Sequence, residues 1–300
     1  MEEAQQQQPQ RQPQQPAAKK PSLFSNRRFL YLAILVVIIA VIAVLLFGGT
    51  GGSSGAQLSQ FDGQPVSQGV MAQLAIPNSV SASVGGGFAT NFPKATSGAP
   101  ALTLNGKPEV LYIGADYCPF CAVQRWALVM ALMRFGSFTG LEYMTSSATD
   151  SYSNTPTFTF ANATYTSQYI SFVGRETTTN VYNSTLGGYP ELQKLNASEN
   201  AILAKYNVPS PSCPTGGCIP FVDYANVSYD VGGNYGNPNI LANMNWSAIA
   251  SNLNNANTTQ AQALVGAANL VTAQICMLTN NTPGSVCGQA YVKSLESELG

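Results

Sequence analysis

The chain has 300 residues, of which 45% are hydrophobic and only 9% are charged, and its net charge at pH 7 is −1. This length allows one large domain or two small ones. A sparsely charged, slightly acidic chain offers no basic surface to a polyanion, so nucleic acid is not an expected partner.

The first 64 residues predict a membrane anchor followed by a linker. Residues 1–28 are rich in Gln and Pro and are expected to form a disordered tail. Residues 29–47 are an uncharged apolar run, and a helix of that length rises about 28 Å, enough for a hydrocarbon core about 30 Å thick. A cleaved signal peptide is the alternative, although its apolar region usually has only about 7–15 residues. Residues 48–64, which begin with Gly and Ser, are expected to be a flexible linker.

Basic residues predict the orientation of this anchor. No Lys or Arg follows the apolar run until Lys94. The positive-inside rule then places the tail in the cytoplasm and residues 65–300 outside, in a single-pass cell-membrane protein. The basic residues that precede the run are Arg11, Lys19, Lys20, Arg27 and Arg28.

The segment between the linker and residue 145 predicts the start of an α/β domain. Residues 56–108 are expected to hold one or two strands, including residues 70–76. Residues 109–115 are apolar on both faces, as in a buried central strand. Residues 121–135 have apolar side chains at helical spacing, and residues 141–145 are the next strand candidate. This order predicts a right-handed parallel crossover.

The second half predicts a β-rich insertion and a helical C-terminal extension. The insertion covers about residues 150–205 and is expected to hold a hairpin from residues 157–160 and 165–173. A short helix is expected at 198–206. Its aromatic residues could bind sugars or peptide, but packing of one hairpin face on the core is the favoured interpretation. Residues 219–224 and 227–231 are expected to be paired strands. The pattern is helical from residue 246 onward.

The six cysteines predict a disulfide-permissive compartment. All of them follow the apolar run, and outside the membrane disulfides can persist. Six cysteines allow 15 pairings, so proximity gives only a preference. The favoured pairs are Cys118 with Cys121, Cys213 with Cys218, and Cys276 with Cys287.

The Cys-Pro-Phe-Cys box at Cys118–Cys121 carries the clearest chemical signal. It follows a predicted strand and opens a predicted helix, so its thiols lie near unpaired backbone N–H groups and the positive end of the helix dipole. Both features favour thiolate, the attacking species in disulfide exchange. The box therefore predicts a thiol–disulfide redox centre.

The element order and several short motifs resemble known families. The order strand, CPFC box, helix, strand, insertion, X-Pro strand, hairpin and helix resembles the thioredoxin-like superfamily over roughly residues 105–260. More narrowly, the chain resembles an archaeal membrane-anchored family, domain-of-unknown-function family 929. The shared marks are the anchor, the Tyr-Cys-Pro-Phe-Cys box, the Thr-Phe-Thr-Phe segment and the Cys-Ile-Pro-Phe-Val-Asp strand. The superfamily implies a thioredoxin-like central sheet with flanking helices; the narrower family implies no established reaction.

The resemblance to the superfamily implies roles for individual residues. Cys118 matches the attacking thiol and Cys121 the resolving thiol. Ile219-Pro220 matches a cis-proline loop that faces the dithiol and offers the backbone of Ile219 to a substrate strand. Catalysis is thus expected to depend on Cys118, Cys121 and Pro220.

Two departures from the superfamily leave proton transfer open. The buried acid that thioredoxins carry six residues before the first cysteine is replaced here by Tyr112, and the chain has no histidine. Water, Asp116 or Asp223 could serve Cys121 in that role.

The cysteines also allow other interpretations. Cys118 and Cys121 could form an inert structural disulfide, or could join the second pair in a four-cysteine zinc site. Cys213 and Cys218 could clip a loop or could act as a relay that exchanges with the CPFC pair. Cys276 and Cys287 are expected to form a structural disulfide.

Asn-x-Ser/Thr sequons are frequent after the apolar run, although several would occur by chance in a chain so rich in Asn, Ser and Thr. The predicted topology makes them glycosylation candidates. They begin at Asn162, Asn183, Asn196, Asn226, Asn245, Asn257 and Asn280.

The sequence thus predicts a membrane-anchored thiol–disulfide oxidoreductase that acts on exported proteins with cysteines. No FAD, quinone or haem motif is visible, so a separate redox partner is expected to reset the dithiol. The alternative is a redox-inert cell-surface domain used for binding or adhesion.

Overall fold

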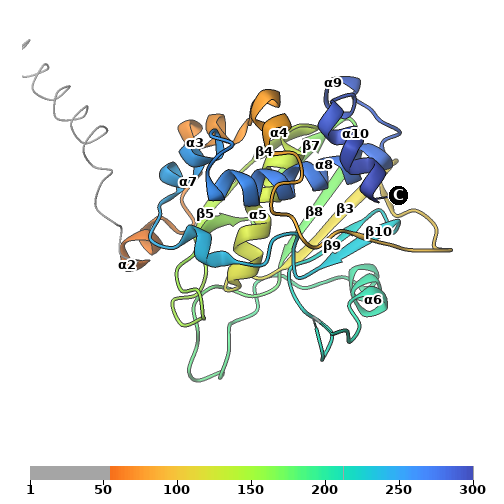
Figure 1. Ribbon diagram of the computed structural model, residues 1–300. Helices are drawn as coiled ribbons and strands as arrows, with labels where there is room; N and C mark the ends of the chain where they lie inside the picture. The colour runs from red at the N-terminus through yellow and green to blue at the C-terminus, as the bar shows by residue number, and fades with distance from the viewer. Residues whose placement is uncertain (1–54, 212, 300) are drawn as a thin grey trace, which may run out of the picture. The chain divides into compact units, whose positions relative to one another are not determined.

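The structure is a computed structural model that describes residues 55–211 and 213–299 (Figure 1). The predicted tail, the predicted membrane span at residues 29–47 and the start of the linker lie outside the described residues. Within them, one helical stretch, Ala261–Leu278, is long and apolar enough to cross a membrane. Because 83% of it is buried inside the domain, this stretch is a core helix.

Helical segments lie at both ends of the domain, and most strands lie between them. The helical segments are α2 (Gly55–Leu58), η1 (Ser59–Phe61), α3 (Gln68–Leu74), α4 (Asn78–Val84), α5 (Pro119–Leu132), α6 (Ala197–Tyr206), η2 (Pro238–Leu241), α7 (Trp246–Leu253), η3 (Ala261–Val265), α8 (Gly266–Leu278), α9 (Gly284–Cys287) and α10 (Ala290–Leu299). The strands are β1 (Lys94–Ala95), β2 (Thr103–Leu104), β3 (Lys107–Gly114), β4 (Gly136–Thr139), β5 (Glu142–Thr145), β6 (Pro156–Thr159), β7 (Thr164–Ser167), β8 (Ser171–Glu176), β9 (Phe221–Tyr224) and β10 (Ser228–Val231).

A mixed sheet forms the centre of this α/β domain. Its order is β1–β10–β9–β3–β2, and β8 pairs with β3. The β3–β8 pair is parallel, whereas β9 is antiparallel to β3 and β10 is antiparallel to β9. The predicted central strand and the predicted hairpin after Pro220 are therefore confirmed.

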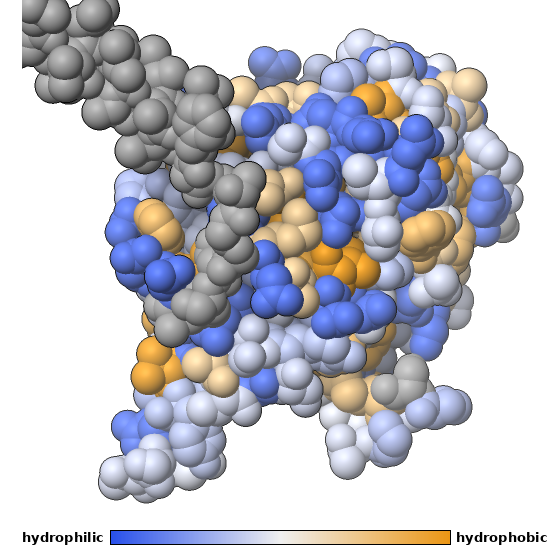
Figure 2. Space-filling model, turned by 60° about the vertical axis from the view of Figure 1, so that its left-hand side comes forward, coloured by the Kyte–Doolittle hydropathy of each residue, from blue (hydrophilic) through white to orange (hydrophobic). Residues whose placement is uncertain are grey.

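Helices cover both faces of this sheet (Figure 1). Side chains alternate along β3, so Val110 and Tyr112 belong to the large core that contains α5 and α8. Leu111 and Ile113 point the other way and pack with Tyr206 of α6. The C-terminal helix α8 is thus part of the main core. On the face drawn in Figure 2, hydrophobic and hydrophilic residues are interspersed, as expected for a water-exposed surface.

The parallel partner of the central strand differs from the predicted one. The predicted strand at residues 141–145 exists as β5, but it pairs antiparallel with β6 in a separate two-stranded sheet. β6 is buried along its whole length, and the ring of Phe158 lies 4.5 Å from that of Trp126 on α5. The β5–β6 pair therefore covers a flank of α5, and the parallel position beside β3 goes to β8.

The predicted insertion at 150–205 consequently contains a strand of the central sheet. The predicted hairpin between residues 157–160 and 165–173 is wrong, because β6 and β7 pair with β5 and β4. Phe158 and Phe160 are buried in the main core. These two aromatic residues pack as the favoured interpretation predicts.

The predicted strand at residues 70–76 is also wrong, because this segment lies mostly in helix α3. Ser67 caps the helix, with its hydroxyl oxygen accepting the N–H of Val70 at 3.3 Å. Val70 and Leu74, four residues apart, are both buried on one face of α3. The helical pattern from residue 246 onward is confirmed by α7, η3 and α8, and the disulfide Cys276–Cys287 joins α8 to α9.

Candidate functional site

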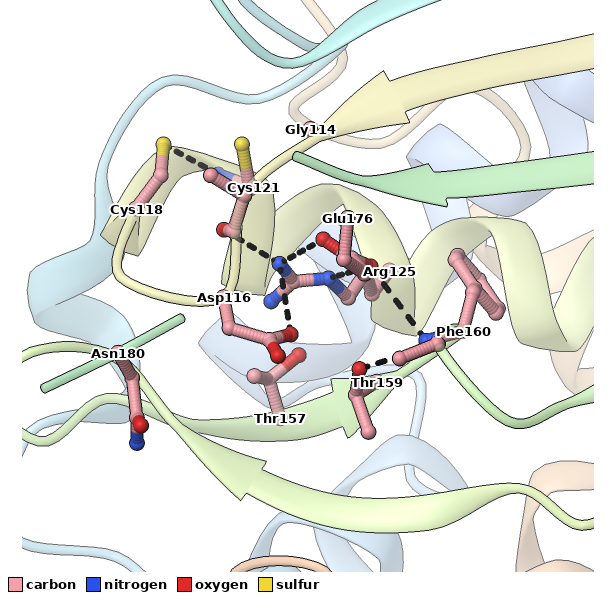
Figure 3. Close-up of polar contacts among 12 residues, drawn as sticks. Gly114, Asp116, Cys118, Cys121, Arg125, Thr157, Thr159, Phe160, Glu176 and Asn180 are labelled. Carbon is pink, nitrogen blue, oxygen red and sulfur yellow. Dashed lines mark hydrogen bonds and ion pairs between the residues drawn. The ribbon is translucent and has the colours of Figure 1, made fainter. Parts of the chain in front are cut away.

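The two cysteines of the CPFC box lie at the amino end of α5, directly after the central strand β3 (Figure 3). Cys118 is the N-cap residue and Pro119 occupies the first turn, where its missing N–H costs nothing. The sulfur of Cys118 accepts the backbone N–H of Cys121 at 3.2 Å. A negative charge on this sulfur would therefore meet the N–H groups and the positive dipole end of the helix.

Both thiols are free, and their environments shift their pKa values in opposite directions. Burial opposes ionisation of Cys118, but hydrogen bonds from the thiol and backbone of Cys121 and the charge of Arg125 outweigh it, so the pKa of Cys118 is lowered. Burial raises the pKa of Cys121 well above its ordinary value, and the neighbouring Cys118 raises it further. Cys118 keeps 4% of its surface exposed, whereas Cys121 keeps none. This arrangement is typical of an attacking thiolate beside a protonated partner.

The loop before β9 comes from far along the chain and touches the first cysteine. The Ile219–Pro220 bond is cis, as the resemblance predicts. The Cys118 thiol donates a weak hydrogen bond to the carbonyl oxygen of Ile219 at 3.9 Å. The structure thus brings Cys118, Cys121 and Pro220 together.

Beneath the dithiol lies a buried charge cluster (Figure 3). Sequence reasoning named only its Asp116 and missed Arg125 and Glu176. Arg125, one helical turn after Cys121, donates to the two carboxylate oxygens of Glu176 at 2.8 and 2.7 Å. The same guanidinium donates to the carbonyl of Ala115 at 2.6 Å and lies 3.6 Å from a carboxylate oxygen of Asp116. The available signal was a single charged residue, Arg125, inside a helix that is otherwise uncharged.

The carboxylates of this cluster have perturbed acidities. Burial raises the pKa of Glu176 to about 7, although the charge of Arg125 opposes the effect. Burial also raises the pKa of Asp116, again against Arg125. The Arg125 charge acts to lower the pKa of both cysteines, although burial outweighs this effect at Cys121, and it thereby links the cluster electrostatically to the dithiol.

The other proton-transfer candidates divide between the two sheet faces. Asp116 joins the cluster under the dithiol. Asp223 on β9 pairs with Leu111 and so lies on the α6 face of the sheet, opposite the face that α5 covers. Tyr112 is fully buried below the site, and its hydroxyl has no hydrogen-bond partner among the described residues. That hydroxyl lies directly over Gly114, where an added Cβ would meet it at 2.0 Å.

The second cysteine pair forms a disulfide, Cys213–Cys218. Asn207 holds the loop, since its side-chain oxygen accepts the N–H of Cys218 at 3.1 Å and its amide donates to the Cys218 carbonyl at 2.7 Å. The zinc alternative would need thiolates from both Cys213 and Cys218, and here these sulfurs are joined. Among residues 55–211 and 213–299, no three His, Cys, Asp or Glu side chains gather as a metal site.

A cavity of about 430 Å³ lies beside the dithiol. It connects the CPFC box, through Phe120, with the loop of Cys218 and Ile219 and with the end of β10. The side chain of Phe120 is 36% exposed there. The full lining is Thr90, Asn91, Phe120, Cys218, Ile219, Val231, Gly232, Gly233 and Gly236.

The sequons differ in accessibility. Asn162, Asn196, Asn257 and Asn280 are exposed. Asn183, Asn226 and Asn245 are partly exposed. The side-chain amide of Asn226 donates to the carbonyl of Pro100 at 2.8 Å, so the nitrogen that would carry a glycan already has a partner.

Comparison with known proteins identifies one family. The family model described as "Domain of unknown function (DUF929)" matches residues 96–277, which is more than half of the chain. The match confirms the resemblance that the Tyr-Cys-Pro-Phe-Cys and Cys-Ile-Pro-Phe-Val-Asp segments indicate. No curated protein and no solved structure gives a significant match.

Proposed function

We propose that this protein, which belongs to the family of domain of unknown function DUF929, is a thiol–disulfide oxidoreductase acting through Cys118 and Cys121. The observation that carries the proposal is the asymmetry of the dithiol. Cys118 caps a helix and accepts the N–H of Cys121, and its pKa is lowered, whereas the pKa of the fully buried Cys121 is raised. The Cys118 sulfur is thus favoured as the attacking thiolate, and the Cys121 sulfur stays protonated until the second step.

A thioredoxin-like architecture is part of the same proposal. Its support is the chain order of β3, CPFC box, α5, parallel strand β8, α6, the Ile219–Pro220 loop, the β9–β10 hairpin and α8. The contact between Cys118 and Ile219 also supports it, since a substrate strand that pairs with this loop would lie across the attacking sulfur.

The reductive direction of the reaction has two steps. The Cys118 thiolate attacks one sulfur of a substrate disulfide, a mixed disulfide forms, and the other substrate sulfur leaves as a thiolate that takes up a proton. Cys121 then loses its proton and attacks the Cys118 sulfur, which releases the second substrate thiol. Two electrons have passed to the substrate, and Cys118 and Cys121 are joined. The same steps in reverse form a disulfide in a substrate dithiol.

The proposed setting is the outer side of a cell membrane. It rests on the apolar run at residues 29–47 and on the basic residues before it. The substrates would then be exported proteins with cysteines, and a separate redox partner would reset the dithiol. The partly exposed Phe120 and the adjoining cavity offer such a substrate an apolar contact next to Cys118.

The test is turnover of a disulfide-containing protein such as insulin, with dithiothreitol as reductant. We expect catalysis by the full chain and none by Cys118→Ser. Cys121→Ser is expected to accumulate a mixed disulfide with the substrate. The matched control is Cys276→Ser/Cys287→Ser, which removes a distant disulfide and should keep turnover. Equal rates for wild type and Cys118→Ser would support the redox-inert binding domain instead.

A further inference from the structure

The second disulfide lies next to the attacking thiol. The Cys118 thiol contacts the carbonyl of Ile219 at 3.9 Å, and Ile219 directly follows Cys218. Consecutive Cα atoms are only about 3.8 Å apart. Cys218 also lines the same cavity as Phe120 of the CPFC box. A free dithiol and a closed disulfide, separated by nearly a hundred residues of sequence, thus meet at one cavity.

The two sulfurs of that disulfide are not equally accessible. Cys213 is fully buried, whereas Cys218 is partly exposed at the cavity. A thiolate that reaches the disulfide through the cavity therefore meets Cys218 first. The distal disulfide differs in this respect, because Cys276 and Cys287 are both fully buried.

Asn207 holds the Cys213–Cys218 loop independently of its S–S bond. It binds the backbone of Cys218 on both sides, and its own carbonyl accepts the N–H of Gly217 at 2.9 Å. Its side-chain oxygen lies 4.0 Å from the Cys213 sulfur, where it can accept a hydrogen bond from a released thiol. The hydrogen bonds from Asn207 to the backbone of Cys218 do not involve the sulfurs, so they can hold that backbone beside the cavity when the S–S bond opens.

We propose that Cys213–Cys218 is the internal redox partner of the CPFC dithiol, with Cys218 as the sulfur that Cys118 attacks. The proposal rests on the proposed function of Cys118 and adds to it a second redox site. In the first step the Cys118 thiolate forms a bond to the Cys218 sulfur. The Cys213–Cys218 bond breaks, and the Cys213 sulfur leaves with the electron pair and takes up a proton.

The second step completes the exchange. Cys121 loses its proton and attacks the Cys118 sulfur, and the Cys218 sulfur leaves and is protonated. Cys118 and Cys121 end as a disulfide, whereas Cys213 and Cys218 end as two thiols. Two electrons and two protons have moved between the pairs, so no external oxidant or reductant is consumed. The relay can thus pass electrons between a substrate at Cys118 and a thiol or disulfide reagent that reaches Cys218.

The direct test is to trap the mixed disulfide in the full chain. In Cys121→Ser/Cys213→Ser, the thiols left beside the cavity are Cys118 and Cys218, and mild oxidation is expected to join them. In the matched variant Cys121→Ser/Cys218→Ser, Cys118 and Cys213 should stay free. Thiol-reactive mass tags distinguish the two results, since the first protein should take no tags and the second should take two. Peptide mapping under non-reducing conditions identifies the linked residues.

A second measurement keeps both cysteines of the loop disulfide and follows the rate at which it is reduced. We expect dithiothreitol to open Cys213–Cys218 about tenfold more slowly in Cys118→Ser than in wild type, because the intramolecular route is lost. The buried Cys276–Cys287 bond should open at the same rate in both proteins. Three results would overturn the relay: a disulfide between Cys118 and Cys213, no disulfide between Cys118 and either loop cysteine, or equal rates of opening of Cys213–Cys218 in the two proteins.

The relay and the proposed function fail in different ways. Cys118 in Cys121→Ser can be offered oxidised glutathione as an external disulfide. Formation of the glutathione adduct without any Cys118–Cys218 bond would overturn the relay and keep the proposed function. Absence of both products would overturn the two together.

Discussion

Replacement of Arg125 by Met removes the positive charge beneath the dithiol and keeps a long apolar side chain. Arg125 is fully buried and makes two short bonds to Glu176 and one to the Ala115 carbonyl. Removal of one partner of a buried ion pair typically costs about 3–5 kcal/mol, because the other charge is left without compensation. We expect a loss of this size in the free energy of unfolding near pH 8.

The pH dependence of that loss has a definite sign. The pKa of Glu176 is raised from 4.5 to about 7 in the folded protein even with Arg125 present, and without it the pKa would rise further. A raised pKa means that the folded state loses stability as pH rises from the unfolded value through the folded one. Wild type completes this loss near pH 7, whereas Arg125→Met continues to lose stability above it. The difference between the two proteins should therefore widen as pH rises above about 7.

The same substitution should change the chemistry of the dithiol. The Arg125 charge lowers the pKa of Cys118, so its removal should raise that pKa and slow alkylation of Cys118 at neutral pH. The matched control is Arg134→Met, just after the other end of α5, where the guanidinium binds neutral groups of Thr272, Ser81 and Asn269 and lies over the ring of Tyr291. It should lower stability without changing Cys118.

The assays are chemical denaturation followed by the fluorescence of the two buried tryptophans, and iodoacetamide alkylation of Cys118 from pH 6 to pH 10. An unchanged alkylation profile in Arg125→Met, or the same change in Arg134→Met, would refute the electrostatic link. A stability difference that narrows above pH 7 would refute the account of Glu176.

Three further outcomes are expected. Cys276→Ser/Cys287→Ser should lose about 3 kcal/mol of stability, as estimated for a cross-link with a sequence separation of 11, while alkylation of Cys118 stays unchanged. Burial raises the pKa of Asp230 from 3.8 to about 7, so the wild type should lose stability as pH rises between these values, by on the order of 4 kcal/mol from this group. Asp230→Asn should flatten this part of the plot of unfolding free energy against pH. A plot as steep as that of the wild type would contradict the role of Asp230. Phe120→Ala should slow reduction of a protein disulfide severalfold through lost apolar contact in the cavity and leave exchange with glutathione unchanged; equal losses with both substrates would exclude a substrate-binding role.

Local patterns predicted the parts of the site that depend on neighbours in sequence. The apolar run at residues 109–115 and the helix signal after Cys118 placed the dithiol correctly, because a strand, a cap and a helix follow one another there. The prediction of a strand at residues 70–76 was wrong because the apolar residues there suit either a strand or a helix. The N-cap at Ser67 favours the helix.

The other contacts of the site join residues far apart in sequence, and local patterns could not predict them. Glu176 reaches Arg125 only because β8 pairs in parallel with β3 and brings Glu176 opposite Gly114. Sequence reasoning gave the strand beside β3 to residues 141–145, so it could not place Glu176 near Arg125. The contact between Cys118 and the Ile219 loop spans 101 residues and came from the family resemblance, since no local pattern indicates it.

The most direct test of the central claim is redox equilibration of the full chain in glutathione buffers, with mass tags that report Cys118 and Cys121. The account predicts that the pair opens and closes reversibly, with a midpoint potential above about −300 mV. A pair that stays closed in every buffer, with a potential below about −300 mV, would contradict it and leave Cys118 and Cys121 a structural disulfide.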